Sequence, residues 1–590
     1  MKSAYNIEER LSLVRAAMGQ EPFDLIIRNV KVLNVVSGEL LPGVLGIKHG
    51  RIVTTQAAKD AETKNEYDGG GRFAVPGLID THVHVDSTLV TPEGLAELIV
   101  PAGTTCLLAD PMEIANVAGI EGLKALLQAA EDLPYHIFVE VSSRVPTAPG
   151  LETTGGVLGL EEVKELLAWP QSVSLGELDP SKVLGLREEY FAKIQAAWEL
   201  NKIANGHAIG LEGAGLDAYA CAGLADDHEC VTFEEARDRV RRGLAVLIRE
   251  GSTERNLEAL IKGLVKHGSE LASWMFCTDD KHPDDIKREG HIDWMVRQAV
   301  ALGLEPLHAV QLATINAARH FRLEQEIGSL TPGRWADIIL VSDLNDFQPQ
   351  EVFFKGKLVA NKGRLLEKVP VSSYPDWLRH TVKVGRGRQG DHFALHSKGD
   401  SAEVRVIELF PDQIINREGR ASLPVVDGCV QNDVANDVLK LSVVERHGKT
   451  GTIGTAFVHG FGLKQGALAS SVSHDHHNIV IVGTNDDDMA ACVRAVEETQ
   501  GGMVAVLDGE LLGRVELPLG GLLSEKPVDK VISELERLNE SVRGQLGGVL
   551  PAPMMTLSFI SLPTVPELGL TDLGLVDVLG HKLISVFVNE

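Results

Sequence analysis

The sequence predicts an α/β protein built around a (β/α)8 barrel of the TIM type, with a small flanking β-sandwich and a C-terminal α/β domain. Short apolar runs typical of strands alternate with helical segments over residues 76–325, which indicates parallel strands joined by helical crossovers. Val/Ile-rich runs broken by Gly and Asn turns stand on either side of that region. From about residue 385 the pattern changes again, and strand-like and helical runs mix.

The length and charge of the chain limit what it can be. The chain has 590 residues, and length alone suggests about three or four domains. Hydrophobic residues make up 44% and charged residues 24%, as in ordinary soluble globular proteins. The net charge of −27 makes nucleic-acid backbones and anionic membrane surfaces poor partners, because both would repel the protein.

The N-terminal region and the cysteines indicate a cytoplasmic protein. Residues 1–22 lack the apolar core of a secretion signal and are typical of a short amphipathic helix. No stretch of the sequence approaches the roughly 20 apolar residues that span a bilayer. The six cysteines are scattered without a CxxC pair, which favours reduced thiols over a disulfide framework or a zinc ribbon.

The predicted domain boundaries follow the changes of pattern. Residues 1–75 hold the N-terminal helix and, within 24–56, the first strands of the sandwich. Residues 326–380 repeat that texture and form its second half. Because the two segments bracket the barrel of residues 76–325, we expect them to join beside it.

The C-terminal region, residues 381–590, is predicted to be a separate α/β domain. Within it "HNIVIVGTN" indicates a strand, and "DDDMAACVRAVEETQGG" indicates a helix that follows it. Only a single Gly precedes that helix, so the sequence does not support a dinucleotide-binding fingerprint, which is rich in glycine.

Eight strand-like runs define the barrel. Eight parallel strands with helical crossovers are the number that closes a barrel of this type. Thr232 and Glu235 form a capping-box pattern at the start of one crossover helix. The strands are expected near residues 78–86, 104–110, 135–143, 172–178, 202–208, 226–230, 244–251 and 273–280.

The first of these strands, "LIDTHVHVDSTLV", carries polar side chains at every second position, with apolar side chains between them. In an extended strand this period of two places all the polar groups on one face. Carboxylates and imidazoles are costly to bury without partners, and a metal ion would pair with them. The polar residues are Asp80, His82, His84 and Asp86.

Active-site groups of such barrels project from the C-terminal ends of the strands, and here five strand ends carry metal-type ligands. Imidazole and carboxylate groups bind Zn, Fe and Mn, and a carboxylate can bridge two cations. The sequence therefore predicts a metal-dependent barrel with two divalent ions per chain, of Mn, Fe or Zn. The ligand-type residues are His82 and His84 on the first strand, Glu177 on the fourth, His207 on the fifth, His228 on the sixth, and Asp279 and Asp280 on the eighth.

Glu177 and Asp279 are the expected catalytic residues. Two ions about 3.5–4 Å apart can share a water and lower its pKa from about 15.7 towards 7. Asp279 would accept a proton from that water and pass it to the leaving group, first as general base and then as general acid. We expect His82, His84 and Asp279 at one ion, His207 and His228 at the other, and Glu177 between both.

Each of these residues alone has an ordinary structural interpretation. An HxH pair is often two structural histidines, Glu177 could be a carboxylate in a salt bridge, and Asp279 ahead of a helix could be an N-cap. Taken together, these interpretations require five strand ends to carry a metal-type residue by coincidence. We therefore favour the metal site.

Two further segments could support the ligands or contact a substrate. The second strand ends in Asp110 and is followed by a helix that opens at Glu113, where helix capping is the alternative. "SVSHDHHN" brings His474, Asp475 and His477 in front of an apolar strand, and there a polar turn is the alternative. This turn could close the mouth of the barrel or hold a further ion.

At these residues the chain resembles the amidohydrolase superfamily, through "PGLIDTHVH", the carboxylate of strand four, the histidines of strands five and six and the aspartate of strand eight. Within it the chain is similar to the two-metal adenine deaminases of bacteria, over "DPMEIANV", "CTDDKHP" and "SHDHHNIVIVG". The resemblance implies hydrolytic deamination of adenine to hypoxanthine and ammonia in purine salvage, by a metal-activated hydroxide that attacks C6.

The resemblance also implies the partners. They are a small purine base and water, with no nucleic acid and no membrane, and a homodimer is expected because similar barrels commonly form one. No organic cofactor is needed. Polar groups would bind the edge of the base, for which Glu113, Asp280 and the "SHDHHN" segment are candidates.

Two other functions remain open at this point. A cyclic-amide hydrolase of the dihydroorotase or hydantoinase kind would share the barrel and the HxH motif, but such enzymes usually bridge their metals with a carboxylated lysine from strand four. Here strand four offers Glu177, and Lys182 lies beyond its end. A non-catalytic scaffold would have lost some ligands, whereas this chain keeps the full set.

Overall fold

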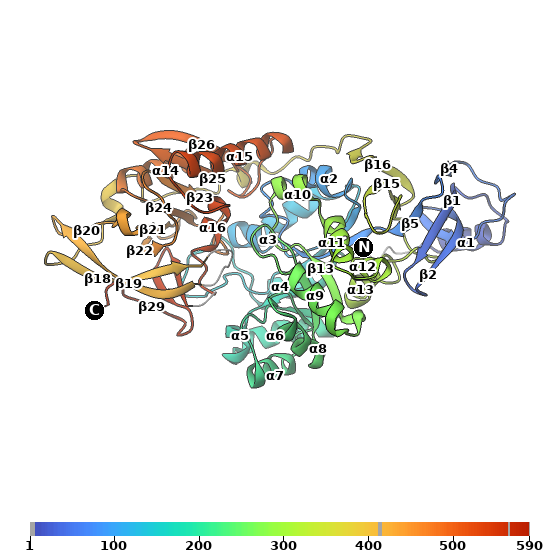
Figure 1. The fold of residues 1–590 in the computed structure, drawn as a ribbon, viewed down its shortest axis with the longest axis horizontal. Coiled ribbons are helices and arrows are strands. Elements are labelled where there is room, and N and C mark those ends of the chain that lie inside the picture. Colours follow the sequence, from blue (N-terminus) through green and yellow to red (C-terminus); the bar gives the residue numbers. More distant parts are fainter. Residues whose placement is uncertain (1–5, 411–415, 565–566, 589–590) are drawn as a thin grey trace.

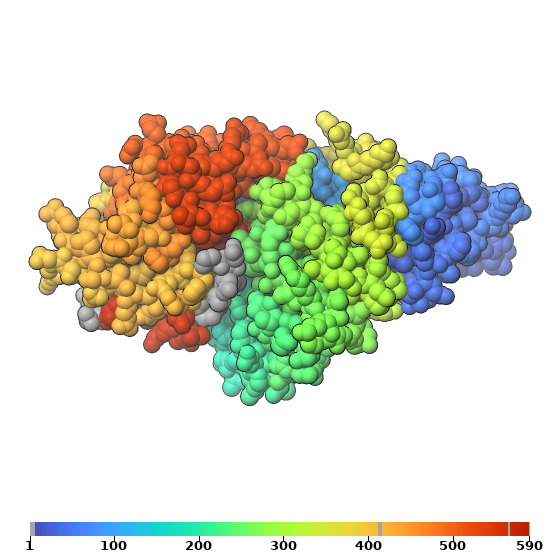
Figure 2. Space-filling view, in the orientation of Figure 1, coloured from blue at the N-terminus to red at the C-terminus, as the bar shows by residue number. Residues whose placement is uncertain are grey.

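The computed structural model describes residues 6–410, 416–564 and 567–588. The molecule is elongated, and the barrel lies between a β-rich unit at one end and the C-terminal domain at the other (Figure 1). In the space-filling view the C-terminal domain packs directly against the barrel (Figure 2). Within these described residues, no helix combines the length and the apolar character needed to cross a bilayer.

All eight predicted barrel strands are present, and every pair of neighbours that hydrogen-bonds is parallel. Ala225 N donates to Ala204 O at 2.8 Å where the fifth and sixth strands meet, and Asp279 N donates to His82 O at 3.0 Å where the eighth meets the first. These two joints close the ring. The strands are β6 Leu78–Val83, β7 Thr104–Ala109, β8 His136–Val141, β9 Ser172–Leu178, β10 Ile203–Gly206, β11 Asp226–Asp227, β12 Ala245–Arg249 and β13 Trp274–Cys277.

Helices follow the barrel strands and cover their outer face. The predicted capping box is confirmed at α8 Phe233–Arg241, where the Thr232 side chain accepts from Glu235 N and the Glu235 side chain bonds back to the cap. Such a cap stabilises a helix by about 1 kcal/mol. The other helices of the barrel are α2 Pro92–Ile99, α3 Met112–Ala129, α4 Leu160–Leu167, α5 Pro180–Leu184, α6 Glu188–Glu199, α7 Gly213–Cys221, α9 Leu257–His267, α10 Pro283–Glu289, α11 Ile292–Ala301, α12 Pro306–Leu312 and α13 Ile315–His320.

The two flanking segments join beside the barrel, as the sequence predicts. They form one nine-stranded sheet in which β14 pairs antiparallel with β5, and Ile339 lies opposite Val75. The sheet curls, because Arg51 of β3 also pairs with Trp335 just ahead of β14, and its inner face holds one apolar cluster. The strands are β1 Leu25–Asn34, β2 Glu39–Lys48, β3 Arg51–Thr54, β4 Glu66–Asp68, β5 Phe73–Pro76, β14 Ile338–Val341, β15 Pro349–Phe354, β16 Lys357–Asn361 and β17 Arg364–Leu365.

The predicted N-terminal helix is α1 Ile7–Ala17, which begins after the cap residue Asn6. Residues 1–5 of that prediction lie outside the described residues. The helix packs on the curled sheet through Ala16, which lies in a small apolar cluster with Phe23 and Ile26.

The C-terminal domain is built on a second nine-stranded sheet, antiparallel except for the pair β18 and β22. The predicted strand "HNIVIVGTN" is β24 Ile479–Gly483, and the helix after it is α14 Asp486–Glu498. The remaining elements are α15 Val528–Gly544, α16 Pro553–Phe559, β18 Ser401–Leu409, β19 Asn416–Val426, β20 Cys429–Val430, β21 Val438–Val444, β22 Ile453–His459, β23 Ala467–Ser470, β25 Gly502–Leu507 and β26 Glu510–Glu516, with the small sheet β27 Leu568–Thr571, β28 Gly574–Asp577 and β29 Lys582–Ile584.

Buried hydrogen bonds fix this domain on the barrel. In the loop after β8, Thr153 makes two of these bonds: its N donates to Asp572 Oδ1 at 2.9 Å, and its O accepts from Asn478 Nδ2 at 2.9 Å. Asn478 ends the turn of residues 471–478 between β23 and β24, so the docking holds that turn next to the C-terminal ends of the barrel strands.

Candidate active site

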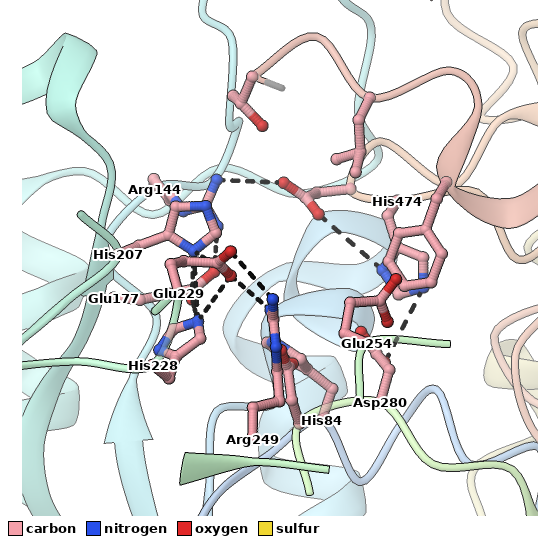
Figure 3. Close-up of a pocket in the computed structure, with 15 residues that line it drawn as sticks. His84, Arg144, Glu177, His207, His228, Glu229, Arg249, Glu254, Asp280 and His474 are labelled. Carbon is pink, nitrogen blue, oxygen red and sulfur yellow. Dashed lines mark hydrogen bonds and ion pairs between the residues drawn. The ribbon is translucent and has the colours of Figure 1, made fainter. Parts of the chain in front are cut away.

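Side chains from five barrel strand ends converge on one pocket, and Figure 3 shows them facing each other. The strand order explains the convergence, because the C-terminal ends of parallel strands in a closed barrel meet at one mouth. Of the predicted metal ligands, the ones that line the pocket are His84, Glu177, His207, His228 and Asp279, and His82 lies just behind them.

Glu177 stands at the centre of these groups. Its Oε2 atom lies 3.6 Å from His82 Nε2, 3.2 Å from His207 Nδ1 and 3.1 Å from His228 Nε2. A single carboxylate therefore faces both the histidine of strand one and the histidines of strands five and six. This is the position that a bridging ligand between two ions requires.

Asp279 faces the two histidines of strand one. Its Oδ1 atom lies 3.4 Å from His84 Nε2 and 4.0 Å from His82 Nε2. Its other oxygen, Oδ2, accepts a hydrogen bond from Arg249 Nη1 at 2.8 Å. The structure thus brings together the three residues that the sequence predicts at one ion.

Hydrogen bonds on the far nitrogen of each ring aim both strand-one histidines at the pocket. His82 Nδ1 lies 2.6 Å from Glu140 Oε2, and His84 Nδ1 lies 2.9 Å from the main-chain oxygen of Asp110. Carboxylates and carbonyls accept the proton at Nδ1, which leaves Nε2 with its lone pair towards the centre. His82 Nε2 is buried and has no hydrogen-bond partner among the described residues.

The charges around the centre favour a cation. Burial lowers the pKa of His82, but the Glu140 carboxylate more than offsets this and raises it to about 10. Burial likewise lowers the pKa of His207, whereas Glu229 and Glu177 raise it to about 9. The imidazoles therefore lie in a strongly negative field.

The residues present fit divalent metal ions. Within the described residues, four buried groups of three ligand atoms, all within 4.8 Å of one another, occur here: His82, His84 and Glu177; Glu177, His207 and His228; His84, Asp279 and Asp280; and His228, Glu229 and Asp279. The mixture of imidazole and carboxylate suits borderline cations such as Zn, Fe or Mn. An ion would also supply the partner that His82 Nε2 lacks.

Not every polar residue of the first strand faces this centre. Asp80 accepts hydrogen bonds from Thr278 N at 3.0 Å and from Thr278 Oγ1 at 2.5 Å, and so ties strand one to strand eight. Asp86 accepts from Ile114 N at 2.6 Å at the start of α3. Asp80 is therefore held between strands one and eight, and Asp86 is bound through Oδ2 to the start of α3, while its Oδ1 is buried without a hydrogen-bond partner among the described residues. Of the four polar residues of the alternating pattern, the two histidines face the metal-type ligands.

The remaining candidates from the sequence divide into pocket residues and supports. Asp280, His474 and Asp475 line the pocket. Glu113 lies behind it, where its carboxylate contacts His474 Nδ1 at 3.2 Å and makes a close contact with His477 Nε2. Asp110 supports His84 through its backbone, and its Oδ1 accepts from Ser142 Oγ at 2.6 Å.

Five charged residues of the site were not predicted from the sequence. Arg144 binds Glu177 and lies 3.3 Å from Asp475 Oδ2, and Arg249 Nη1 lies 2.5 Å from Glu229 Oε1. Arginine is not a metal ligand, so the strand-end pattern does not point to Arg144 after strand three or to Arg249 on strand seven. Arg249 is the last residue of β12, and this position was the available signal. The other two residues are Glu254, which lines the pocket, and Glu140, which no sequence pattern singles out.

Comparison with known proteins agrees with this geometry. The sequence profile described as "Amidohydrolase family" matches residues 73–359, and the one described as "Adenine deaminase C-terminal domain" matches residues 413–582. The chain is 55% identical over 575 residues to a protein named adenine deaminase from Desulforamulus reducens, which covers 98% of each chain. The chain belongs to the adenine deaminase family.

A second relative matches the chain over nearly its whole length, and a solved structure matches a smaller part of it. Adenine deaminase 2 of Carboxydothermus hydrogenoformans is 40% identical, over 97% of this chain and 99% of its own. Among solved structures, a β-aspartyl dipeptidase from Fervidobacterium islandicum AW-1 is 19% identical, with a TM-score of 0.46, over 59% of this chain and 99% of its own. The family membership confirms the resemblance drawn from the sequence motifs.

Proposed function

We propose that the protein hydrolyses adenine to hypoxanthine and ammonia. One observation carries the proposal: a chain that matches an adenine deaminase over its full length also brings four histidines, Glu177 and Asp279 together at the mouth of its barrel. Adenine is a cyclic amidine, and its hydrolysis needs an activated water, a base that takes a proton from that water, and a proton for the departing amine.

We assign two divalent ions, of Mn, Fe or Zn, to this site. His82, His84 and Asp279 would hold one, His207 and His228 the other, and Glu177 would contact both, in keeping with its three contacts of 3.1 to 3.6 Å to imidazole nitrogens. When bound, such ions supply a water nucleophile that is active at neutral pH.

Asp279 is the group best placed to move protons. Burial raises its pKa, but the charge of Arg249 at Oδ2, together with those of the neighbouring histidines His228 and His84, outweighs burial and holds that pKa below its usual range. The carboxylate is therefore ionised at neutral pH and ready to accept a proton from the attacking water. It would then deliver this proton to the exocyclic nitrogen, so that ammonia leaves as the C6–N bond breaks.

Arg144 fixes the orientation of Glu177. Burial raises the pKa of Glu177, but the charges of Arg144 and His207 outweigh it and hold the pKa well below its usual range. Glu177 is thus kept as a carboxylate, which is the form that can contact two cations.

The surroundings of Lys182 disfavour the cyclic-amide alternative. Such hydrolases usually bridge their metals with a carboxylated lysine from strand four, and here Lys182 Nζ forms an ion pair with Asp179 Oδ2 at 2.8 Å. Its side chain is fully buried in that pair. The group that strand four does present to the pocket is Glu177, which favours deamination. A scaffold without activity is also disfavoured, because every predicted ligand faces the same centre.

The test is ammonia release from adenine, guanine, cytosine, adenosine and dihydroorotate by Mn-supplemented protein, with and without chelator. We expect release from adenine alone, and we expect chelation to abolish it. Ring opening of dihydroorotate without ammonia release from any base would move the protein to the cyclic-amide class. We further expect a homodimer in the cytoplasm, without nucleic-acid or membrane partners.

A further inference from the structure

The C-terminal domain forms one wall of the pocket. His474 and Asp475 from the turn of residues 471–478, and Phe559 at the end of α16, line it together with the barrel residues. In Figure 3 His474 lies with Asp280 and Glu254 on one side, and Glu177, His207 and His228 lie on the other. A base in the pocket would therefore touch the proposed metal ligands on one side and the C-terminal domain on the other.

The ring of His474 is held rigidly in this wall. Its Nδ1 atom lies 3.2 Å from Glu113 Oε1, within hydrogen-bonding distance. Its plane stacks on Phe559, with ring centroids 4.4 Å apart and an angle of 8° between the planes. A hydrogen bond on one nitrogen and a stacked ring leave the histidine a single orientation, with Nε2 away from Glu113.

The remaining nitrogen, Nε2, carries a proton that forms no hydrogen bond within the part of the chain that the structure describes. Three carboxylates surround the ring: Glu113, Asp280 at 3.9 Å from Nε2, and Asp475 at 3.9 Å from Nδ1. A carboxylate therefore stands beside each ring nitrogen, Glu113 at Nδ1 and Asp280 at Nε2, and these two negative groups favour the ring that carries a hydrogen on both nitrogens. Burial lowers the pKa of His474, but the same two carboxylates outweigh burial and raise that pKa. The distance from Nε2 to Asp280 is too long for a hydrogen bond.

We propose that His474 binds the substrate directly, by donating a hydrogen bond from Nε2 to a ring nitrogen of the base, and that Glu113 positions it for this contact. The proposal rests on the proposed function and deepens it, because adenine offers unprotonated ring nitrogens as acceptors. The C-terminal domain is then part of the active site, and Glu113, Phe559 and the turn of residues 471–478 join it to the barrel.

A third metal ion is the competing interpretation, because Glu113, His474 and His477 form a buried group of ligand atoms within 4.8 Å. The hydrogen bonds disfavour it. Ser473 N donates to His477 Nδ1 at 3.1 Å, so Nδ1 carries the lone pair and the proton of the neutral ring sits on Nε2. That Nε2 faces Glu113 Oε2, and the pair is a donor with its acceptor. A metal ligand would need Nε2 without its proton.

The deciding experiment compares inhibition constants of 1-deazaadenine, 3-deazaadenine and 7-deazaadenine for the wild-type protein and for His474→Ala. Each analogue lacks one ring nitrogen. We expect the substitution to weaken two analogues about tenfold or more, as for loss of a hydrogen bond from a charged donor. The third analogue lacks the nitrogen that His474 contacts, so its inhibition constant for His474→Ala should lie within about twofold of the value for the wild-type protein. Equal weakening of all three, or of none, would overturn the proposal.

Two further variants separate recognition from structure. His474→Gln keeps a donor of similar reach, and we expect it to recover part of the lost affinity for the same two analogues. His476→Asn is the matched control: His476 is buried in the same turn, its Nδ1 accepts from Asn478 N at 3.0 Å, and it does not line the pocket. We expect its inhibition constants to equal those of the wild-type protein.

Metal analysis of His477→Gln addresses the third ion. We expect the metal content per chain to equal that of the wild-type protein, whereas loss of one equivalent would establish an ion at Glu113 and overturn the hydrogen-bonded assignment. The proposed function is tested separately, by ammonia release from adenine with the wild-type protein. If adenine is turned over and the three analogues respond equally to His474→Ala, this inference alone fails.

Discussion

Glu140→Gln tests whether the Glu140 carboxylate orients the proposed metal ligand His82. Glu140 Oε2 lies 2.6 Å from His82 Nδ1, and the two side chains are 0% and 1% exposed. Glutamine has the same shape and can still accept a hydrogen bond, so the substitution removes the charge and leaves the packing. The substitution removes the negative charge that orients His82 and makes its Nε2 a stronger electron-pair donor to a metal ion.

The expected magnitude follows from the role of such partners. Removing the group that orients a metal-binding histidine typically lowers metal affinity or activity about 10–100-fold, equivalent to about 1.4–2.7 kcal/mol. We expect a value in the upper part of this range, because the contact is short and buried and water cannot replace the carboxylate. The effect should fall on metal affinity, since Glu140 does not line the pocket.

The assay is the half-saturating Mn²⁺ concentration for adenine deamination by metal-free protein. Glu152→Gln is the control: Glu152 is another buried carboxylate, accepts from Ala148 N at 2.6 Å, and contacts no proposed ligand. Its half-saturating concentration should equal that of the wild-type protein. An unchanged value for Glu140→Gln, or an equal rise for Glu152→Gln, would refute the reasoning.

Three further predictions test other parts of the account. Glu177→Gln should leave a folded barrel but lower the metal content and reduce kcat about 10³-fold, measured by metal analysis and ammonia release, and full activity with both ions bound would contradict it. Asp279→Asn should keep the native melting profile and lower kcat about 10²–10⁴-fold; a kcat near that of the wild-type protein would exclude it as the proton carrier. Burial raises the pKa of Glu289, but hydrogen bonds from Arg255 and Arg288 hold it below its usual value, so its stabilisation is present above the unfolded pKa and is lost as the pH falls. Glu289→Gln should therefore lower Tm more at pH 7 than at pH 4, and an equal drop at both would contradict this.

The barrel and its ligands could be predicted because they depend on local pattern. Each barrel strand is an apolar run between helical segments, and the residue at its C-terminal end faces the mouth whatever the details of packing. This logic located His82, His84, Glu177, His207 and Asp279 on one site. At the first strand the pattern predicted too much. The alternation suggests four equivalent polar groups, whereas the fold gives Asp80 and Asp86 structural hydrogen bonds.

The sequence named Glu113 and His477 as candidates, but the contacts of the supporting groups could not be predicted, because those contacts join distant segments. Glu113 and His477 are 364 positions apart, and only the docking of the C-terminal domain brings them together. Glu140 lies inside a barrel strand whose sequence pattern resembles that of any other buried strand. Its contact with His82 forms only when the fold brings strand three near strand one. The pairing of Arg249 with Asp279 likewise requires the closed barrel. Sequence pattern indicates which groups can bind, and the fold decides what orients them.

The central claim is that two ions held by these residues drive the deamination of adenine. The most direct measurement is ammonia release from adenine while metal-free protein is titrated with Mn²⁺ under tight-binding conditions. The account predicts activity that rises to a plateau at two equivalents of Mn²⁺ per chain. A plateau at one or three equivalents, or full activity in the metal-free protein, would contradict it.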